Sequence, residues 1–200
     1  SFPHSWRSKA PLVYRATPQW FISMEKNNLR KKALKAIDDT AFYPARGKDR
    51  IRSMIETRPD WCISRQRVWG VPLPIFVSKK TKEPLRDPEI IENIAKIYEK
   101  EGADCWFDGN PQKFLGKKYK IEDYIQSTDI CEVWFDSGST HSFVLEKRKD
   151  LTWPASMYLE GSDQHRGWFH SSLLESCGTR GRAPFNSILS HGFVVDGKGL

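Results

Sequence analysis

The stretch from residue 157 to residue 177 constrains the fold more than any other part of the chain. Residues 157–159 predict a short buried strand and residues 164–177 predict a helix, so only residues 160–163 (Glu-Gly-Ser-Asp) separate them. A connection this short is typical of an open α/β sheet, in which ligands bind at the carboxyl ends of the strands. Gly161 would let a ligand approach the backbone closely, and a helix N-terminus favours anionic groups. Carboxylates at this edge could instead hold ribose hydroxyl groups or a substrate ammonium. We therefore expect a nucleotide-like ligand.

Alternating strands and helices elsewhere favour a parallel, doubly wound sheet. Strands are expected at 12–16, 20–22, 60–64 and 188–195, and helices over the apolar positions from Leu29 to Ile37 and from Ile51 to Ile55. The run Arg30-Lys31-Lys32 is interpreted as a solvated helix face.

Residues 72–130 have a different pattern, which predicts a small α+β insertion. A strand is expected at 73–77, then a helix with Asp87 as its N-cap, Pro88 at its first position and Gly102 at its end, and a hairpin around 114–119. The chain is therefore divided into residues 1–71, 72–130 and 131–200.

Composition narrows the class of protein. A hydrophobic fraction of 38% over 200 residues predicts a folded globule, and a net charge of +7 suits a polyanion such as RNA or serves solubility alone. The four cysteines form no Cys-x-x-Cys pair, and no stretch resembles a signal peptide or a membrane span, so we expect reduced thiols in a cytoplasmic protein. The first residue is not Met and the last residues stop within a motif, so we expect a piece of a longer chain.

Four segments carry a resemblance to a known family. Residues 58–70 (RPDWCISRQRVWG) resemble a signature of the class I aminoacyl-tRNA synthetases of the Ile/Val/Leu group. Residues 134–141 (WFDSGSTH) and 160–169 (EGSDQHRGWF) narrow it to the isoleucyl-tRNA synthetases. Residues 192–200 (GFVVDGKGL) resemble the lead-in to the Lys-Met-Ser-Lys-Ser motif. The resemblance covers essentially the whole chain, and its motifs are long and rich in rare residues.

The resemblance implies a fold and a reaction. Residues 1–71 would be the catalytic segment that returns from the editing insertion, residues 72–130 a connective peptide, and residues 131–200 the second half of a Rossmann-like parallel sheet. Such enzymes join isoleucine to ATP, with Mg²⁺, release pyrophosphate, and transfer the aminoacyl group to the 3′ end of tRNA(Ile). Catalysis is mainly positioning and stabilisation of phosphate charge. The whole enzyme would be a cytoplasmic monomer with no membrane partner.

The resemblance also implies site residues, none of them assigned as catalytic. Glu160 would bind the isoleucyl-adenylate, Trp134 and Trp168 would wall the isoleucine pocket, and we expect the Glu160 carboxylate and the His191 imidazole to share one cavity. The ribose and aminoacyl region would be lined by Gly161, Asp163 and Gln164, and the adenosine by His191 and Gly192.

Structural interpretations of the same residues stay open. Each tryptophan could be a core residue, and Glu160 could be a charge at a helix N-terminus. Arg65 and Arg67 are salt-bridge partners or contacts to the tRNA acceptor end. No role is assigned to three histidines that packing or surface positions would explain: His141, His165 and His170.

Two departures from the family limit what is implied. The His-Ile-Gly-His segment and the body of the editing domain are absent from these residues, so we expect the isolated chain to be inactive. Ser5 and Ser8 stand where many relatives carry Cys-x-x-Cys, and serine is a poor zinc ligand, so no metal is expected. The alternative function is a freestanding nucleotide- or RNA-binding module descended from such an enzyme.

Overall fold

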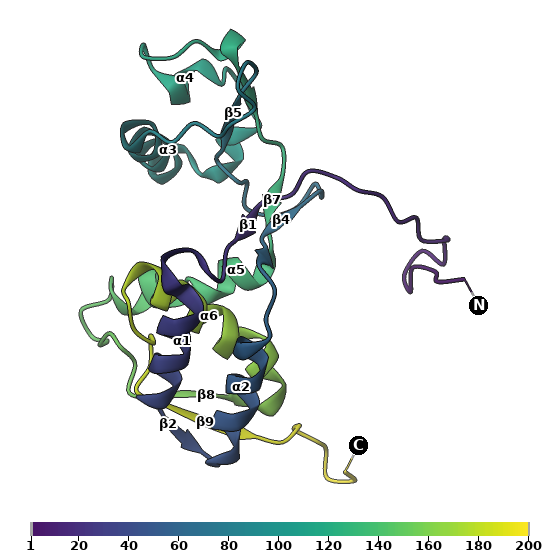
Figure 1. The fold of residues 1–200 in the computed structure, drawn as a ribbon, viewed down its shortest axis with the longest axis vertical. Coiled ribbons are helices and arrows are strands. Elements are labelled where there is room, and N and C mark those ends of the chain that lie inside the picture. The colour runs from purple at the N-terminus through teal and green to yellow at the C-terminus, as the bar shows by residue number, and fades with distance from the viewer. Residues whose placement is uncertain (1, 200) are drawn as a thin grey trace.

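The structure is a computed structural model that describes residues 2–199. Two lobes and an extended N-terminal arm are visible in Figure 1. One lobe, called the sheet lobe, contains a hydrophobic cluster of residues between Met24 and Trp61 and between Tyr158 and Ile188. The other, called the insertion lobe, has a separate cluster of residues between Phe76 and Leu115. Each lobe therefore has buried side chains of its own.

A three-stranded parallel sheet organises the sheet lobe. Its order is β2 (Ala41–Tyr43), β9 (Ser187–His191), β8 (Tyr158–Gly161), and both pairings are parallel. Side chains alternate between the two faces of a strand, so the paired residues Phe42, Ile188 and Tyr158 share the buried face. The parallel α/β sheet expected from the sequence is confirmed.

Helices cover one face of this sheet. They are α1 (Leu29–Asp38), α2 (Arg46–Glu56), α5 (Val133–Gly138) and α6 (Trp168–Thr179), with η1 (Lys26–Asn28), the π-helical η4 (His141–Leu145) and the 3-10 helix η5 (Ser162–Arg166). Figure 1 shows α1, α5 and α6 on one side of the three strands. On the opposite face Tyr43 and Leu159 are each 55% exposed. Within residues 2–199 these helices therefore cover one face of the sheet.

Arg30 joins α1 to the end of α2. Its guanidinium donates hydrogen bonds to the carbonyl oxygens of Ile55 (2.5 Å), Glu56 (3.1 Å) and Arg58 (2.8 Å), and its Nε donates to Glu25. These carbonyls lie at the C-terminus of α2, where helical partners are missing. Arg30 therefore makes tertiary contacts, and only Lys31 and Lys32 of the basic run are exposed as expected.

The insertion lobe combines helices with an antiparallel pair of strands. The strands are β5 (Phe76–Ser78) and β6 (Tyr124–Gln126), and the helices are α3 (Pro88–Glu101), η2 (Ala103–Trp106), α4 (Gln112–Leu115) and η3 (Ile121–Asp123). The Asp87 carboxylate caps α3 by accepting from the Glu89 N–H at 3.0 Å, as the sequence predicts. The hairpin expected around 114–119 is wrong: the chain forms α4 and turns at Gly116, whose φ is +60°.

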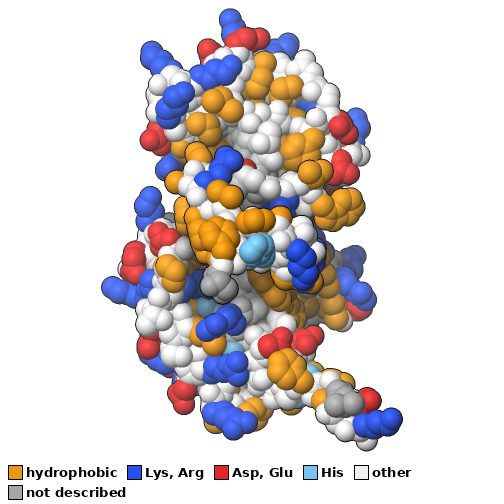
Figure 2. Space-filling model, turned by 90° about the vertical axis from the view of Figure 1, so that its right-hand side faces the viewer, with side chains coloured by type: hydrophobic (Ala, Val, Ile, Leu, Met, Phe, Trp, Pro, Cys, Tyr) orange, Lys and Arg blue, Asp and Glu red, His pale blue; other side chains and the backbone are white. Residues whose placement is uncertain are grey.

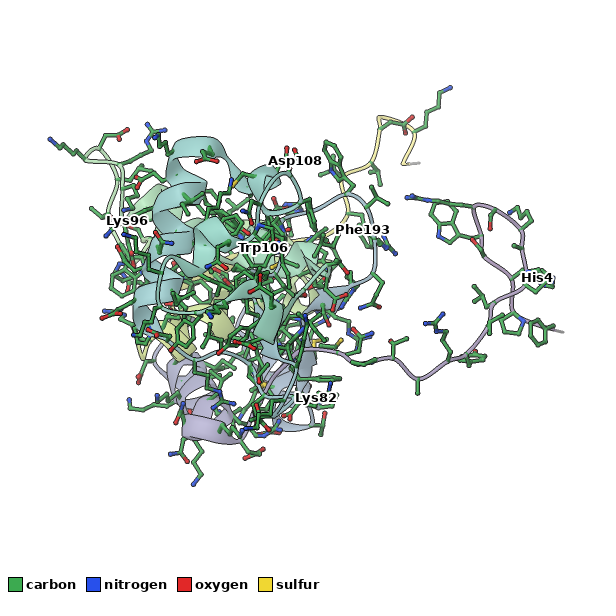
Figure 3. All side chains as sticks on the ribbon, turned by 90° about the horizontal axis from the view of Figure 1, so that it is seen from above. His4, Lys82, Lys96, Trp106, Asp108 and Phe193 are labelled. Atoms are coloured by element: carbon green, nitrogen blue, oxygen red, sulfur yellow. The ribbon has the colours of Figure 1, made fainter. Side chains whose placement is uncertain are left out.

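Trp106 is the centre of the insertion lobe. It is 2% exposed, and its ring centroid lies 5.0 Å from that of Phe76 and 4.8 Å from that of Phe114. Its indole N–H donates to the Ser127 carbonyl at 2.8 Å. Figure 3 shows Trp106 inside the lobe, with Lys82 and Lys96 at its periphery.

Short antiparallel pairs lie between the lobes. They are β1 (Phe21–Ile22) with β3 (Trp61–Cys62), and β4 (Ser64–Arg65) with β7 (Ile130–Cys131). On the face seen in Figure 2, hydrophobic side chains gather where the lobes meet, and Lys and Arg side chains lie on both lobes. The positive charge is therefore dispersed, as the sequence indicates.

One strand prediction fails near the N-terminus, and another is only partly right near the C-terminus. Residues 12–16 are irregular, and Val13 and Tyr14 are 82% and 85% exposed, because no strand lies beside them in the arm that carries His4 (Figure 3). The last strand ends at His191, and Phe193 lies on an irregular segment. Apolar alternation without a partner strand does not make a strand.

All four cysteines are free, and three of them are buried. Among the residues that the structure describes, no helix is both long enough and apolar enough to span a membrane.

Candidate functional site

The carboxyl ends of β8 and β9 lie side by side. Glu160 pairs with Ser190, and Gly161 pairs with His191. Glu160 is exposed, and its carboxylate accepts from the Gly161 N–H at 3.3 Å. A Cβ at position 161 would lie 2.5 Å from an oxygen of Asp163, so glycine lets that carboxylate fold back over the strand end. Helix η5 begins directly afterwards at Ser162, which confirms the short strand-to-helix connection.

Four of the expected site residues surround one hollow. Its volume is about 370 Å³, and its lining is Trp134, Ser137, Glu160, Gln164 and Trp168. Two indole faces, one carboxylate and one carboxamide therefore converge from β8, η5, α5 and α6. An apolar wall with a few polar groups is typical of a site for a small amphiphilic ligand.

The lining residues are held by hydrogen bonds and stacking. The Trp168 indole N–H donates to the Ser137 carbonyl at 3.0 Å, and its ring is stacked on Tyr158 at 4.0 Å with an interplanar angle of 2°. The Gln164 carboxamide accepts from the backbone N–H of Trp168 at 2.8 Å and donates to Asp163 at 3.0 Å. Trp168 is thus both packed and part of the wall, so the two interpretations of this residue are compatible.

Gly167 is a site-forming residue that the sequence interpretation missed. A Cβ there would lie 2.5 Å from the Gln164 carboxamide oxygen and 3.0 Å from Cη2 of Trp134. Real Cβ atoms essentially never approach another heavy atom this closely, so glycine is what lets both side chains meet over the start of α6.

His191 and Gly192 line a different hollow. Its volume is about 360 Å³, and its other lining residues include Arg46, Arg50, Ser162 and His165. The cavity expected to contain both Glu160 and His191 is not formed by residues 2–199. Glu160 pairs with Ser190, one position before His191. The Glu160 side chain lies with Trp134 and Trp168, whereas His191 lies with Arg46 and Arg50 of α2.

Three buried histidines have ring nitrogens without a hydrogen-bond partner among the described residues. His141, His165 and His170 are 1–3% exposed, which confirms that they are packed in the interior. Burial lowers the pKa of each of them. Arg65 lies 3.9 Å from Glu132, which confirms its salt-bridge interpretation, whereas Arg67 is exposed and has no ion pair in the described part of the chain.

Glu175 is a half-buried acid on α6, the helix that also carries Trp168, and its Oε1 is fully buried. A Cβ at Gly138 would overlap its carboxylate, and burial, with the charges of Asp136 and Glu132, raises the pKa of Glu175 to about 9. A folded pKa above the ordinary 4.5 means that the folded chain keeps a proton that the unfolded chain releases. The stability present below pH 4.5 is therefore lost as the pH rises toward 9.

We expect Glu175→Gln to flatten this pH dependence, because the amide keeps the shape and cannot ionise. Between pH 5 and pH 8, the free energy of unfolding of the unmodified chain should fall by about 1–3 kcal/mol more than that of the variant. Urea unfolding at both pH values measures this difference, with Glu99→Gln on an exposed face of α3 as the control. Equal changes in both variants would contradict the assignment of a neutral Glu175.

Residues 2–199 contain no group of three or more His, Cys, Asp or Glu side chains that could hold a metal ion. Ser5 and Ser8, the two serines expected in place of Cys-x-x-Cys, lie in one turn. The Ser5 hydroxyl accepts a hydrogen bond from the Ser8 N–H at 3.3 Å.

Comparison with known proteins agrees with this architecture. The family model of class I tRNA synthetases (I, L, M and V) matches residues 7–200. The chain therefore belongs to the class I tRNA synthetases of this group.

Its relatives narrow the similarity further. The chain is 80% identical over 200 residues to the isoleucine–tRNA ligase of Pelagibacter ubique (strain HTCC1062), covering all of this chain and 22% of that protein. It is 57% identical over 208 residues to that of Zymomonas mobilis, and 60% identical over 205 residues to that of Brucella abortus biovar 1 (strain 9-941), covering all of this chain and 22% and 21% of those proteins. The chain thus spans about a fifth of the length of these relatives.

Proposed function

We propose that the full-length protein carrying these residues is an isoleucine–tRNA ligase, and that the hollow between Trp134 and Trp168 holds the isoleucine side chain. The observation that carries this proposal is the convergence of two indoles, the Glu160 carboxylate and the Gln164 carboxamide on one hollow of about 370 Å³. The indole walls exclude larger side chains, and the polar groups face the charged end of an amino acid.

The proposed chemistry needs no protein nucleophile. The isoleucine carboxylate attacks the α-phosphorus of ATP, the bond to pyrophosphate breaks, and isoleucyl-adenylate forms. The ribose hydroxyl at the 3′ end of tRNA(Ile) then attacks the carbonyl carbon, and AMP leaves. Glu160 accepts hydrogen bonds from ammonium or hydroxyl groups of the adenylate, and the fixed Gln164 carboxamide orients it.

Gly161 and Asp163 belong to the ribose and aminoacyl region in this proposal, and His191 and Gly192 to the adenosine region. Mg²⁺ would enter with the phosphates of ATP, as is usual for this ion. No protein-bound zinc is proposed at Ser5 and Ser8. The full-length protein is proposed to be a cytoplasmic monomer without a membrane partner.

Glu160→Ala tests the assigned site. We expect the variant of the full-length protein to bind a non-hydrolysable isoleucyl-adenylate analogue about 10–150-fold more weakly, because a charge-assisted hydrogen bond is lost. Calorimetric titration measures this, with Glu160→Gln as the shape-matched variant and Glu99→Ala as the control for an exposed acid. Unchanged affinity of Glu160→Ala would remove Glu160 from the site.

The reaction itself is tested by isoleucine-dependent ATP–pyrophosphate exchange. The full-length protein should catalyse it, and the isolated chain should not, since it lacks the His-Ile-Gly-His and Lys-Met-Ser-Lys-Ser segments. The alternative, a freestanding nucleotide- or RNA-binding module, requires that the full-length protein bind the analogue without any exchange.

A further inference from the structure

A second hollow lies behind the Trp134 wall of the isoleucine hollow. Its volume is about 340 Å³, and the residues that matter here are Arg58, Arg65, Arg166, His170 and Trp134. Trp134 lines both hollows, so they adjoin each other at this residue. A broader surface hollow of about 670 Å³ continues from it and shares Arg58, Arg166 and His170.

Positive charge dominates this second hollow. Its three guanidinium groups face two carboxylates, those of Asp60 and Glu132, and the Asp60 carboxylate already accepts from the Met24 N–H at 2.8 Å. Arg65 lies 3.9 Å from Glu132. Arg166 is exposed and has no ion pair in the described part of the chain, so its charge is available to a ligand.

Two buried donors in the hollow are unsatisfied. His170 is 3% exposed, and its ring makes no well-aligned hydrogen bond within residues 2–199, although the backbone of His165 lies near it. The Arg58 Nε is also buried without a partner, while its guanidinium lies 5.4 Å from the centroid of Trp61. Buried polar groups are nearly always hydrogen-bonded in folded proteins, so these atoms indicate a missing acceptor.

The protonation state of His170 fits an anionic acceptor. Burial, with smaller contributions from Arg58 and Arg166, lowers the pKa of His170 to about 3. The imidazole is therefore neutral at pH 7 and still offers one N–H donor, without the cost of burying a fourth positive charge beside the arginines.

We propose that this hollow binds a backbone phosphate of the tRNA acceptor strand, held by Arg58, Arg166 and His170. The inference rests on the proposed function and adds an RNA subsite to it. A strand whose terminal ribose reaches the isoleucine hollow must place its preceding phosphates in adjoining space. This hollow adjoins the isoleucine hollow at Trp134, and its three guanidinium groups outnumber its two carboxylates, those of Asp60 and Glu132. Guanidinium groups match phosphate oxygens in geometry and charge.

Arg166→Gln in the full-length protein tests the proposal. We expect the KM for tRNA in aminoacylation to rise about tenfold, and the dependence of log KM on log salt to weaken by about one unit of slope. Arg166→Lys should restore part of the affinity, because it keeps the charge. Arg148→Gln removes an exposed arginine outside the hollow and should leave the KM unchanged.

A direct binding measurement separates this proposal from the proposed function. Calorimetry of the full-length protein with the RNA trinucleotide CCA, with pyrophosphate and with inorganic phosphate needs no catalysis. Arg166→Gln should weaken CCA binding most. Equal behaviour of Arg166→Gln and Arg148→Gln toward CCA and tRNA would overturn the proposal, as would an effect on pyrophosphate alone. If the unmodified protein shows neither exchange nor aminoacylation, the proposed function fails, and the CCA titration alone decides on the phosphate subsite.

Discussion

Gly167→Ala is expected to lower the rate of isoleucine-dependent ATP–pyrophosphate exchange by about a hundredfold, since catalysis by positioning loses about that much from a displacement near 1 Å. The added methyl group would lie 2.5 Å from the Gln164 oxygen and 3.0 Å from the Trp134 ring. One of the two must move, and both line the isoleucine hollow. The measurement is kcat and KM for isoleucine in the full-length protein.

Gly178→Ala provides a matched control on the same helix. A Cβ at Gly178 meets only Leu29, at an ordinary 3.7 Å, so alanine fits and slightly favours the helix. Circular dichroism should show that both variants are folded. If Gly167→Ala catalysed ATP–pyrophosphate exchange as fast as Gly178→Ala, the close approach of Gln164 and Trp134 to Gly167 would have no part in the reaction.

Trp106→Ala is expected to remove about 3–5 kcal/mol from the stability of the insertion lobe, which is the usual cost of truncating a fully buried aromatic side chain. The substitution deletes the ring that contacts Phe76 and Phe114 and leaves the Ser127 carbonyl without its indole donor. Hydrogen exchange followed by mass spectrometry should show faster exchange across α3, β5 and β6.

The same experiment tests the division of the chain at residues 72 and 130. Because the two hydrophobic clusters share no residue, peptides from α6 and β9 should keep their protection. Trp6→Ala, at a position that is 74% exposed, is the control. Equal loss of protection in both lobes would mean that they unfold as one unit, and the division would be wrong.

Local signals made much of the fold predictable. The helix between Asp87 and Gly102 was expected from its cap, its proline and its glycine, and the structure has all three in those roles. The short connection between β8 and η5 was expected because strand and helix patterns nearly meet in the sequence. Both features are determined by residues that are close together in the chain, so they can be predicted from a single sequence.

Long-range pairing was not predictable in the same way. Strand β2 has three residues and joins β9 from about 145 positions away, so no sequence pattern marks it. Glu160 and His191 line different hollows because different elements pack beside the ends of β8 and β9, which a sequence does not state. Gly167 was missed because its importance lies in the side chains that approach it, those of Gln164 and Trp134.

The contacts of Arg30 have a practical consequence for engineering. In the sequence, positions 30–32 form a uniform basic run, and all three would be candidates for charge reversal to change solubility or electrophoretic behaviour. Only Lys31 and Lys32 can be exchanged freely, because a lysine or glutamate at position 30 cannot bridge three carbonyl oxygens of a distant helix end. A surface-redesign protocol that ranks residues by charge alone would therefore remove the hydrogen bonds that join α1 to the end of α2.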